Sequence, residues 1–275
     1  MTDTGMVFAA ECRLLDQSFD IASSAGWYSS IAGVLAGFAL LAILLPLDHV
    51  DDDSDTRATS HAVVVFVAAF FSLLLLAFAY AILAGRTSGG AVLVIAAVEQ
   101  MALGGVFGLS TILLLVGLQA VLRSYGANRV VFAPAQSLLR IMIGVLGPIV
   151  VLTLQFSNSL DVSYARLQIG GVDPGACGVL GFPVGVWINL AIIVAGAIGV
   201  GLMAVLRDRI PSTTWAATLV AKMVLALAVT VMVVFAVVVP LLPLTSLTGR
   251  VLEHGMLIAT TAGALAVAYS AWASR

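Results

Sequence analysis

Seven long apolar segments constrain this chain more than any other feature of its sequence. Each is close to the roughly 20 residues that an α-helix needs to cross the hydrocarbon core of a bilayer. Because no water is available there, every backbone N–H and C=O group must find a partner inside the protein, as it does in a helix. We therefore expect membrane-spanning helices at Trp27–Leu47, Ala62–Ala84, Glu99–Leu122, Leu138–Phe156, Val184–Leu206, Ala216–Val239 and Leu252–Ser274.

The composition excludes a water-facing surface over most of the chain. Of the 275 residues, 61% are hydrophobic and 9% are charged, whereas a soluble domain carries about 25% charged residues. No polar stretch is long enough to form a separate soluble domain. The sequence therefore predicts an all-α fold, a polytopic membrane helix bundle over residues 27–275 that follows a short segment over residues 1–26.

The segment over residues 1–26 has the pattern of an amphipathic helix. Four of its less polar side chains follow at spacings of 4, 3 and 4, which places them on one helical face. Such a helix lies in the membrane interface or packs across the mouth of the bundle. Acidic residues precede the first apolar run, so we expect no secretory signal and insertion through an uncleaved first helix. The four residues are Phe8, Cys12, Leu15 and Phe19.

The distribution of basic residues predicts the orientation of the chain. Arginine and lysine are enriched in the cytoplasmic loops of membrane proteins. With seven helices and an outer N-terminus, eight basic residues fall at the inner face against four outside. We expect the N-terminus outside and the C-terminus in the cytoplasm. Eleven of the twelve basic residues are Arg and Lys222 is the one lysine, in a chain rich in Ala, Val and Gly. This composition suggests a bacterial protein of the cell inner membrane.

Polar residues near the outer helix ends are the strongest functional candidates. Ionisable groups inside a membrane are costly and often mark a substrate or ion path. One hypothesis is that these residues converge on a polar outer vestibule that holds a cation or a protonatable group. The alternative is that each meets lipid headgroups and water at its own helix end. The candidates are Glu99, Gln100, Asn189, Glu253 and His254.

Two basic residues lie in the inner halves of their helices. Lys222 is about seven residues, or roughly 10 Å, into its helix, and Arg140 is near the start of another. A lysine at that depth can extend its ammonium group to the inner headgroups. The alternative is a pairing with an acidic group or a substrate anion, and no acidic residue stands at a matching depth in the sequence.

The two cysteines and one acidic loop carry further hypotheses. Cys12 and Cys177 fall on the same predicted side, where they form a disulfide or remain as two thiols. Within the run Asp48–Asp55, the residues Asp51, Asp53 and Asp55 have the spacing that begins a calcium loop, but Thr56 stands where such a loop needs glycine. We interpret the run as a solvated acidic turn, with binding of a divalent cation as the alternative, and we expect no resident metal.

Small residues within the spans favour close helix packing. Gly33 and Gly37 form one Gly-x-x-x-Gly pair, and Gly104 and Gly108 form another. Such pairs let two helix backbones approach, either inside the bundle or between molecules. The dipeptide at residues 147–148, Gly-Pro, predicts a kink, since proline removes a backbone hydrogen bond.

The motifs searched for give no sign of catalysis. The sequence has three histidines and contains neither a His-Glu-x-x-His motif nor a phosphate-binding loop. We therefore expect no enzyme and no cofactor. A net charge of −2 without a basic stripe also argues against nucleic acid as a partner.

Two functions remain. The first is transport or permeation of a small solute or ion through the bundle. The alternative is a non-transporting membrane subunit, scaffold or sensor that acts through helix contacts with a partner protein or a second copy of the chain, and in both cases the lipid bilayer is a partner.

Overall fold

The computed structural model describes residues 20–48, 56–86, 91–124, 129–170, 182–213, 215–241 and 250–273. These residues form helices and their connections, with no strand among them. Seven helices are long and apolar enough to cross a membrane, so the predicted all-α multi-pass bundle is confirmed. The helices are α1 Ile21–Asp48, α2 Thr56–Ala84, α3 Ala91–Ser124, α4 Arg129–Ile141, α5 Gly147–Gly170, α6 Val184–Val205, α7 Ala216–Val233, α8 Val239–Leu241 and α10 Arg250–Ala273.

Two π-helical segments and one 3₁₀ turn interrupt or extend these helices. A π-helix at Met142–Leu146 joins α4 to α5, and another at Val234–Val238 joins α7 to α8. A 3₁₀ turn at Arg207–Arg209 follows α6. The π-helix at Met142–Leu146 ends where the Gly-Pro pair of residues 147–148 begins, and the kink expected at that pair stays a prediction.

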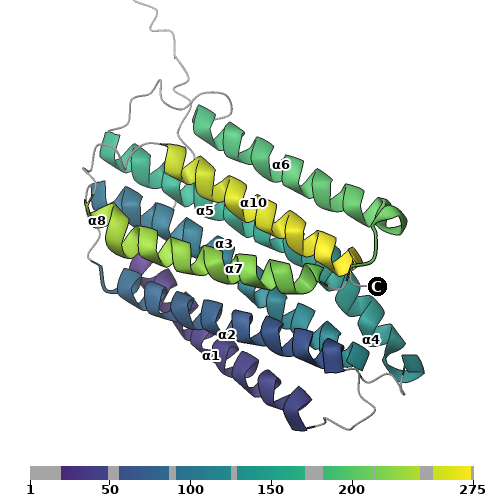
Figure 1. Cartoon of the computed structure of the whole chain (residues 1–275). Coiled ribbons are helices and arrows are strands. Elements are labelled where there is room, and N and C mark those ends of the chain that lie inside the picture. The colour runs from purple at the N-terminus through teal and green to yellow at the C-terminus, as the bar shows by residue number, and fades with distance from the viewer. Residues whose placement is uncertain are drawn as a thin grey trace, which may run out of the picture.

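Helix α3 stands at the centre of the bundle. It packs against α1, α2, α5, α7 and α10, whereas α1 and α6 lie at opposite edges (Figure 1). The glycines of α3 allow close packing, because a Cβ added at Gly108 or Gly117 would lie 2.6 Å from Val151 or 2.7 Å from Phe66. The second predicted Gly-x-x-x-Gly pair is therefore an internal packing surface.

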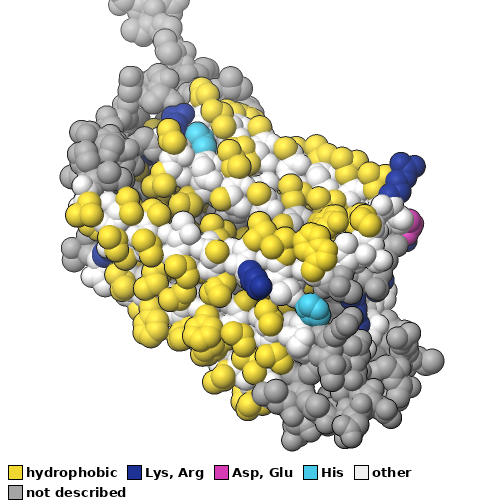
Figure 2. Space-filling model, viewed as in Figure 1, with side chains coloured by type: hydrophobic (Ala, Val, Ile, Leu, Met, Phe, Trp, Pro, Cys, Tyr) yellow, Lys and Arg dark blue, Asp and Glu magenta, His cyan; other side chains and the backbone are white. Residues whose placement is uncertain are grey.

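The outer surface of the bundle is apolar, as a lipid-facing surface must be. Large hydrophobic side chains are exposed on every long helix, among them Trp27, Phe78, Leu154, Ile198 and Val251. Figure 2 shows hydrophobic side chains spread over the visible face, with few charged side chains between them. A monomeric soluble protein rarely exposes so large an apolar area, and the arrangement fits a protein surrounded by lipid.

Several predicted helix boundaries are wrong, and the largest differences are in the third and fourth spans, which are longer than the sequence pattern suggested. The fourth span was expected to end at Phe156, but α5 continues to Gly170. The third was expected to begin at Glu99, with eight surplus residues before it, but α3 is one continuous helix of 34 residues from Ala91. Helix α5 extends beyond its apolar part because buried polar residues such as Ser159 and Ser163 continue it. In α3, residues 91–98 are themselves apolar, and Glu99 and Gln100 are buried inside the helix and do not mark its start.

Candidate functional site

A buried carboxylate joins three helices at one end of the bundle, which we call the Glu253 end. Glu253 lies in the first turn of α10 and is 0% exposed. Its two oxygens accept hydrogen bonds from Nη1 of Arg166 on α5 and from Nδ2 of Asn189 on α6. Because an unpaired charge is expensive to bury, these two donors explain how the carboxylate is accommodated.

A histidine extends this cluster. Nδ1 of His254 lies 2.8 Å from Oδ1 of Asn189, in a hydrogen bond whose direction depends on the tautomer. Asn189 is fully buried and bridges Glu253 and His254. We call these four residues the Glu253 network. It contains the ion pair of Arg166 and Glu253 and two side chains, Asn189 and His254, that can both donate and accept hydrogen bonds.

A second polar cluster lies deeper, where α5 and α10 approach the backbone of α3. Gly104 and Gly105 have no side chains, and polar groups fill the space. A Cβ added at Gly105 would lie 1.9 Å from Nε2 of Gln155 and 2.5 Å from Oγ1 of Thr260. A Cβ at Gly104 would lie 2.5 Å from Nδ2 of Asn158. We call Gly104, Gly105, Gln155, Asn158 and Thr260 the glycine-pair layer.

The glycine-pair layer lies near the middle of the long helices α3 and α10. Thr260 follows Glu253 by seven residues, or two helical turns, which corresponds to about 10 Å along α10. On α5, buried Ser159 and Ser163 occupy the turns between Gln155 and the Glu253 network. A polar face of α5 thus runs from the Glu253 end to the glycine-pair layer, and we call this path the polar seam.

Several polar atoms along the seam have no hydrogen-bond partner. Nε2 of Gln155 donates to the carbonyl oxygen of Met101 at 3.0 Å, but its Oε1 is unpartnered, as is the hydroxyl of Tyr80 next to Gly104. Gln155 is 1% exposed and Tyr80 0%. An unsatisfied buried polar group costs about 1–3 kcal/mol, so these atoms are positions where water or a polar ligand would be stabilised.

The seam ends in an apolar layer. Beyond the glycine-pair layer, α3 and α5 contact one another through buried hydrocarbon side chains, and Val151 packs directly on Gly108. These side chains separate the seam from the opposite end of the bundle, which we call the Arg140 end. The layer is formed by Leu109, Ile112, Leu113, Ile143, Val151 and Leu152.

The remaining vestibule candidates lie elsewhere at the Glu253 end. Glu99 forms an ion pair with Arg86 at the end of α2, and Gln100 hydrogen-bonds Ser24 of α1 at 3.1 Å. A space of about 10 Å³ beside Glu99 has room for about one water molecule. The structure thus brings Asn189, Glu253 and His254 together and places Glu99 and Gln100 in other helix contacts; the vestibule remains a prediction.

Arg166 and Arg86 were not among the predicted site residues. Both were assigned to outer segments by their position between apolar runs, yet each neutralises a buried carboxylate. A signal for Arg166 exists in the sequence. Ser159, Ser163 and Arg166 follow Gln155 at spacings of 4, 4 and 3, which is a helical polar stripe that continues α5 past its apolar part.

No family model, no curated protein and no solved structure matches this chain. Its function must therefore be inferred from its own residues.

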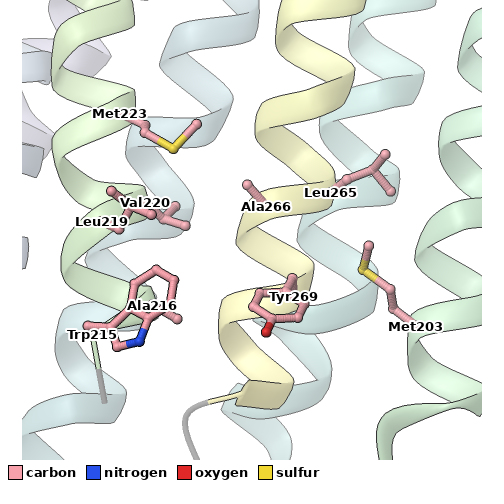
Figure 3. Close-up of a pocket in the computed structure, with 9 residues that line it drawn as sticks. All are labelled: Met203, Trp215, Ala216, Leu219, Val220, Met223, Leu265, Ala266 and Tyr269. Carbon is pink, nitrogen blue, oxygen red and sulfur yellow. The ribbon is translucent and has the colours of Figure 1, made fainter. Parts of the chain in front are cut away.

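Lys222 and the surface next to it are lipid-facing. The Lys222 side chain is exposed on α7. A groove of about 220 Å³ runs between α6 and α7 over α10, lined entirely by apolar or aromatic side chains such as Met203, Trp215 and Tyr269 (Figure 3). Such a lining suits hydrocarbon and offers nothing to select a polar solute.

Other predictions lie outside the described residues. Cys12, Cys177 and the run 49–55 are among the residues of which the structure says nothing, so the disulfide and the acidic loop remain predictions. Within the described ranges, no group of three His, Cys, Asp or Glu side chains is arranged to hold a metal ion.

Proposed function

We propose that the bundle binds and passes a small, uncharged, hydrogen-bonding solute along the polar seam. The observation that carries this proposal is the unpartnered Oε1 of Gln155, a buried acceptor beside the glycine-pair layer at mid-membrane depth. Polar groups at that depth are rarely tolerated without a role. Transporters also commonly bind their substrates near the bilayer midplane.

The chemistry of the seam favours a neutral solute over an ion. At the glycine-pair layer the available groups are amides and hydroxyls, which both donate and accept hydrogen bonds. The charges of the Glu253 network already neutralise one another, since Arg166 pairs with Glu253. An ion in the glycine-pair layer would lose its hydration without gaining an opposite charge.

The apolar layer supplies the barrier that such a function needs. A hydrophobic constriction can close a path by excluding water. Ile143 of this layer lies within the π-helix Met142–Leu146, and π-segments often occur at functional sites. We infer that movement around this π-helix opens the seam toward the Arg140 end.

Flux through the purified protein tests the proposal. Proteoliposomes are mixed rapidly with a hyperosmotic solution of urea or glycerol. The change in light scattering as the liposomes shrink and swell again gives the permeability to each solute. We expect at least one solute to enter about ten times faster than into empty liposomes. Gln155→Leu should abolish the increase, whereas Thr153→Leu, an exposed position on the same helix, should retain it. Permeability equal to that of empty liposomes for both solutes would contradict the proposal.

A second function is favoured by a different observation. Gly33 and Gly37 lie on the exposed face of α1, and a Cβ at either position would meet nothing within 4 Å. Exposed small residues at this spacing form close helix contacts in membranes. A non-transporting subunit that assembles through α1, with a partner or with a second copy, is therefore the alternative.

The proposed location follows from the charge distribution. We place the Glu253 end outside and the Arg140 end in the cytoplasm of a bacterial inner membrane. The excess of arginine and lysine toward the Arg140 end supports this orientation.

A further inference from the structure

Two arginines lie on adjoining helices at the Arg140 end, Arg123 on α3 and Arg140 on α4. Gln136 of α4 donates from Nε2 to the carbonyl oxygen of Leu122 on α3 at 3.0 Å, which fixes α4 against the end of α3. Arg123 follows Leu122 directly, and Arg140 lies one turn from Gln136 on the same face of α4. The hydrogen bond from Gln136 therefore places the two arginines on adjoining parts of α3 and α4.

Several buried donors at this end have no acceptor. Nη2 of Arg123, Nε of Arg140, Nε2 of Gln119 and Nε1 of Trp272 are buried atoms without a hydrogen-bond partner. Gln119 precedes Arg123 by one turn of α3. The Trp272 ring packs on the backbone of Gly144, where an added Cβ would lie 2.9 Å from Nε1, and Gly144 follows Arg140 by one turn. All four unpartnered atoms are N–H donors.

The cluster has a net positive charge that the described side chains do not compensate. Neither Arg123 nor Arg140 forms an ion pair within the described ranges. Two like charges that are partly withdrawn from water repel each other, and a bound anion would remove both this repulsion and the unsatisfied donors.

We propose that Gln119, Arg123, Arg140 and Trp272 form a binding site for an oxyanion of the phosphate class. Guanidinium groups present paired N–H donors that match phosphate oxygens, and such charged hydrogen bonds are short and strong. The phosphate comes either from solution or from the headgroup of an anionic lipid, since the site lies at the end of the bundle. This site is separate from the polar seam and does not depend on the function proposed for it.

Thermal unfolding of the full chain tests the site. Inorganic phosphate is titrated into protein in a neutral detergent, with sodium gluconate holding the ionic strength constant. We expect phosphate to raise the unfolding midpoint. Arg140→Gln should weaken this response about ten-fold or more, and in gluconate alone it should raise the midpoint because it removes the repulsion from Arg123.

Two further variants separate the site from a structural role. Trp272→Phe keeps an aromatic ring on Gly144 but removes the N–H, so it should weaken the phosphate response without preventing folding. Arg209→Gln removes an exposed arginine from the same end and should leave the response unchanged. An equal loss of response in Arg209→Gln would show a general charge effect and would overturn the site.

A lipid arm of the same experiment identifies the source of the phosphate. The protein is mixed with micelles that contain either phosphatidylglycerol or phosphatidylcholine. A response to inorganic phosphate supports a soluble ligand, and a response to phosphatidylglycerol alone supports a lipid headgroup. If neither raises the midpoint above the phosphatidylcholine control, the site does not exist.

Discussion

Glu253 is a fully buried carboxylate at one end of the bundle. Its carboxylate is withdrawn from solvent at a helix end and depends on Arg166 and Asn189 for every observed contact. Arg166 itself keeps about a fifth of its side chain exposed, at 19%. The pair therefore spans from a buried position to the surface of the bundle, and it ties α5 to α10.

Breaking this ion pair should destabilise the protein. Glu253→Gln removes the negative charge that pairs with Arg166, and removal of one member of a buried pair costs about 3–5 kcal/mol. Because Arg166 is partly exposed, we expect about 3 kcal/mol in the free energy of unfolding, measured by SDS titration of the protein in mixed micelles. The double variant Glu253→Gln with Arg166→Gln should recover part of the loss. Additive losses from the two substitutions would show that the charges do not interact.

Glycine 105 should tolerate no side chain. In Gly105→Ala the new methyl group would overlap Nε2 of Gln155 and Oγ1 of Thr260, and overpacking of this kind costs about 1–3 kcal/mol. The control is Gly201→Ala, because a Cβ there meets nothing within 4 Å and alanine is the better helix former. The same unfolding titration should show a loss for Gly105→Ala and none for Gly201→Ala. Equal stability of the two variants would contradict the glycine-pair layer.

At the residue scale, the sequence identified the buried polar side chains of the bundle better than the residues with which they pair. Asn189, Glu253 and His254 were candidates because polar residues in an apolar span are conspicuous. Arg166 was missed because its surroundings in the sequence are polar, which resembles a loop. Whether two distant side chains meet depends on helix rotation, and the apolar pattern of a lipid-facing bundle determines that rotation weakly.

At the element scale, the two Gly-x-x-x-Gly pairs have different surroundings. The pair on α3 faces α5 in the interior, where Val151 packs on Gly108. The pair on α1 is open, and α1 itself contacts chiefly α2 and α3. Hydrogen bonds from Ser29 to the carbonyl oxygen of Ala77 and between Ser24 and Gln100 hold α1 in place, which leaves its opposite face available.

Substitution on the open face of α1 should change assembly without changing the fold. Gly37→Leu fills space that is empty in the monomer, so its unfolding titration should match that of the parent protein. If α1 mediates self-association, chemical cross-linking in native membranes should yield fewer dimers for Gly37→Leu. Unchanged cross-linking would remove the α1 face as a contact between copies of the chain.

The sequence predicted the number and kind of helices and missed where several of them end. Apolar runs mark the lipid-facing part of a helix, so all seven spans could be placed. Helix α5 extends 14 residues past the predicted end at Phe156 because its polar residues face the bundle and not solvent. The π-helix at Met142–Leu146 leaves no mark in hydropathy, and only the Gly-Pro pair that follows it indicated an irregularity.

At the scale of the whole molecule, the odd number of spans sets the sidedness of every site. The described residues contain seven helices that are long and apolar enough to cross a membrane, and seven crossings predict that the two chain ends lie in different compartments. We expect green fluorescent protein fused to the C-terminus to fluoresce and alkaline phosphatase fused there to be inactive, since the excess of arginine and lysine predicts a cytoplasmic C-terminus. An active C-terminal phosphatase would reverse the orientation of the Glu253 network and the oxyanion site together.

If a solute passes along the polar seam, water should reach the middle of the bundle from the Glu253 end. The accessibility of an introduced thiol to a water-soluble reagent tests this entry of water most directly. With Cys12 and Cys177 replaced by serine, Asn158→Cys places a thiol in the glycine-pair layer, and Leu154→Cys places one on the lipid-facing side of the same helix. Only a hydrated thiol ionises and reacts with a membrane-impermeant methanethiosulfonate. We expect Asn158→Cys to react at least about ten times faster than Leu154→Cys, and only when the reagent is added at the Glu253 side. Equal, negligible reaction at both positions would contradict a hydrated seam.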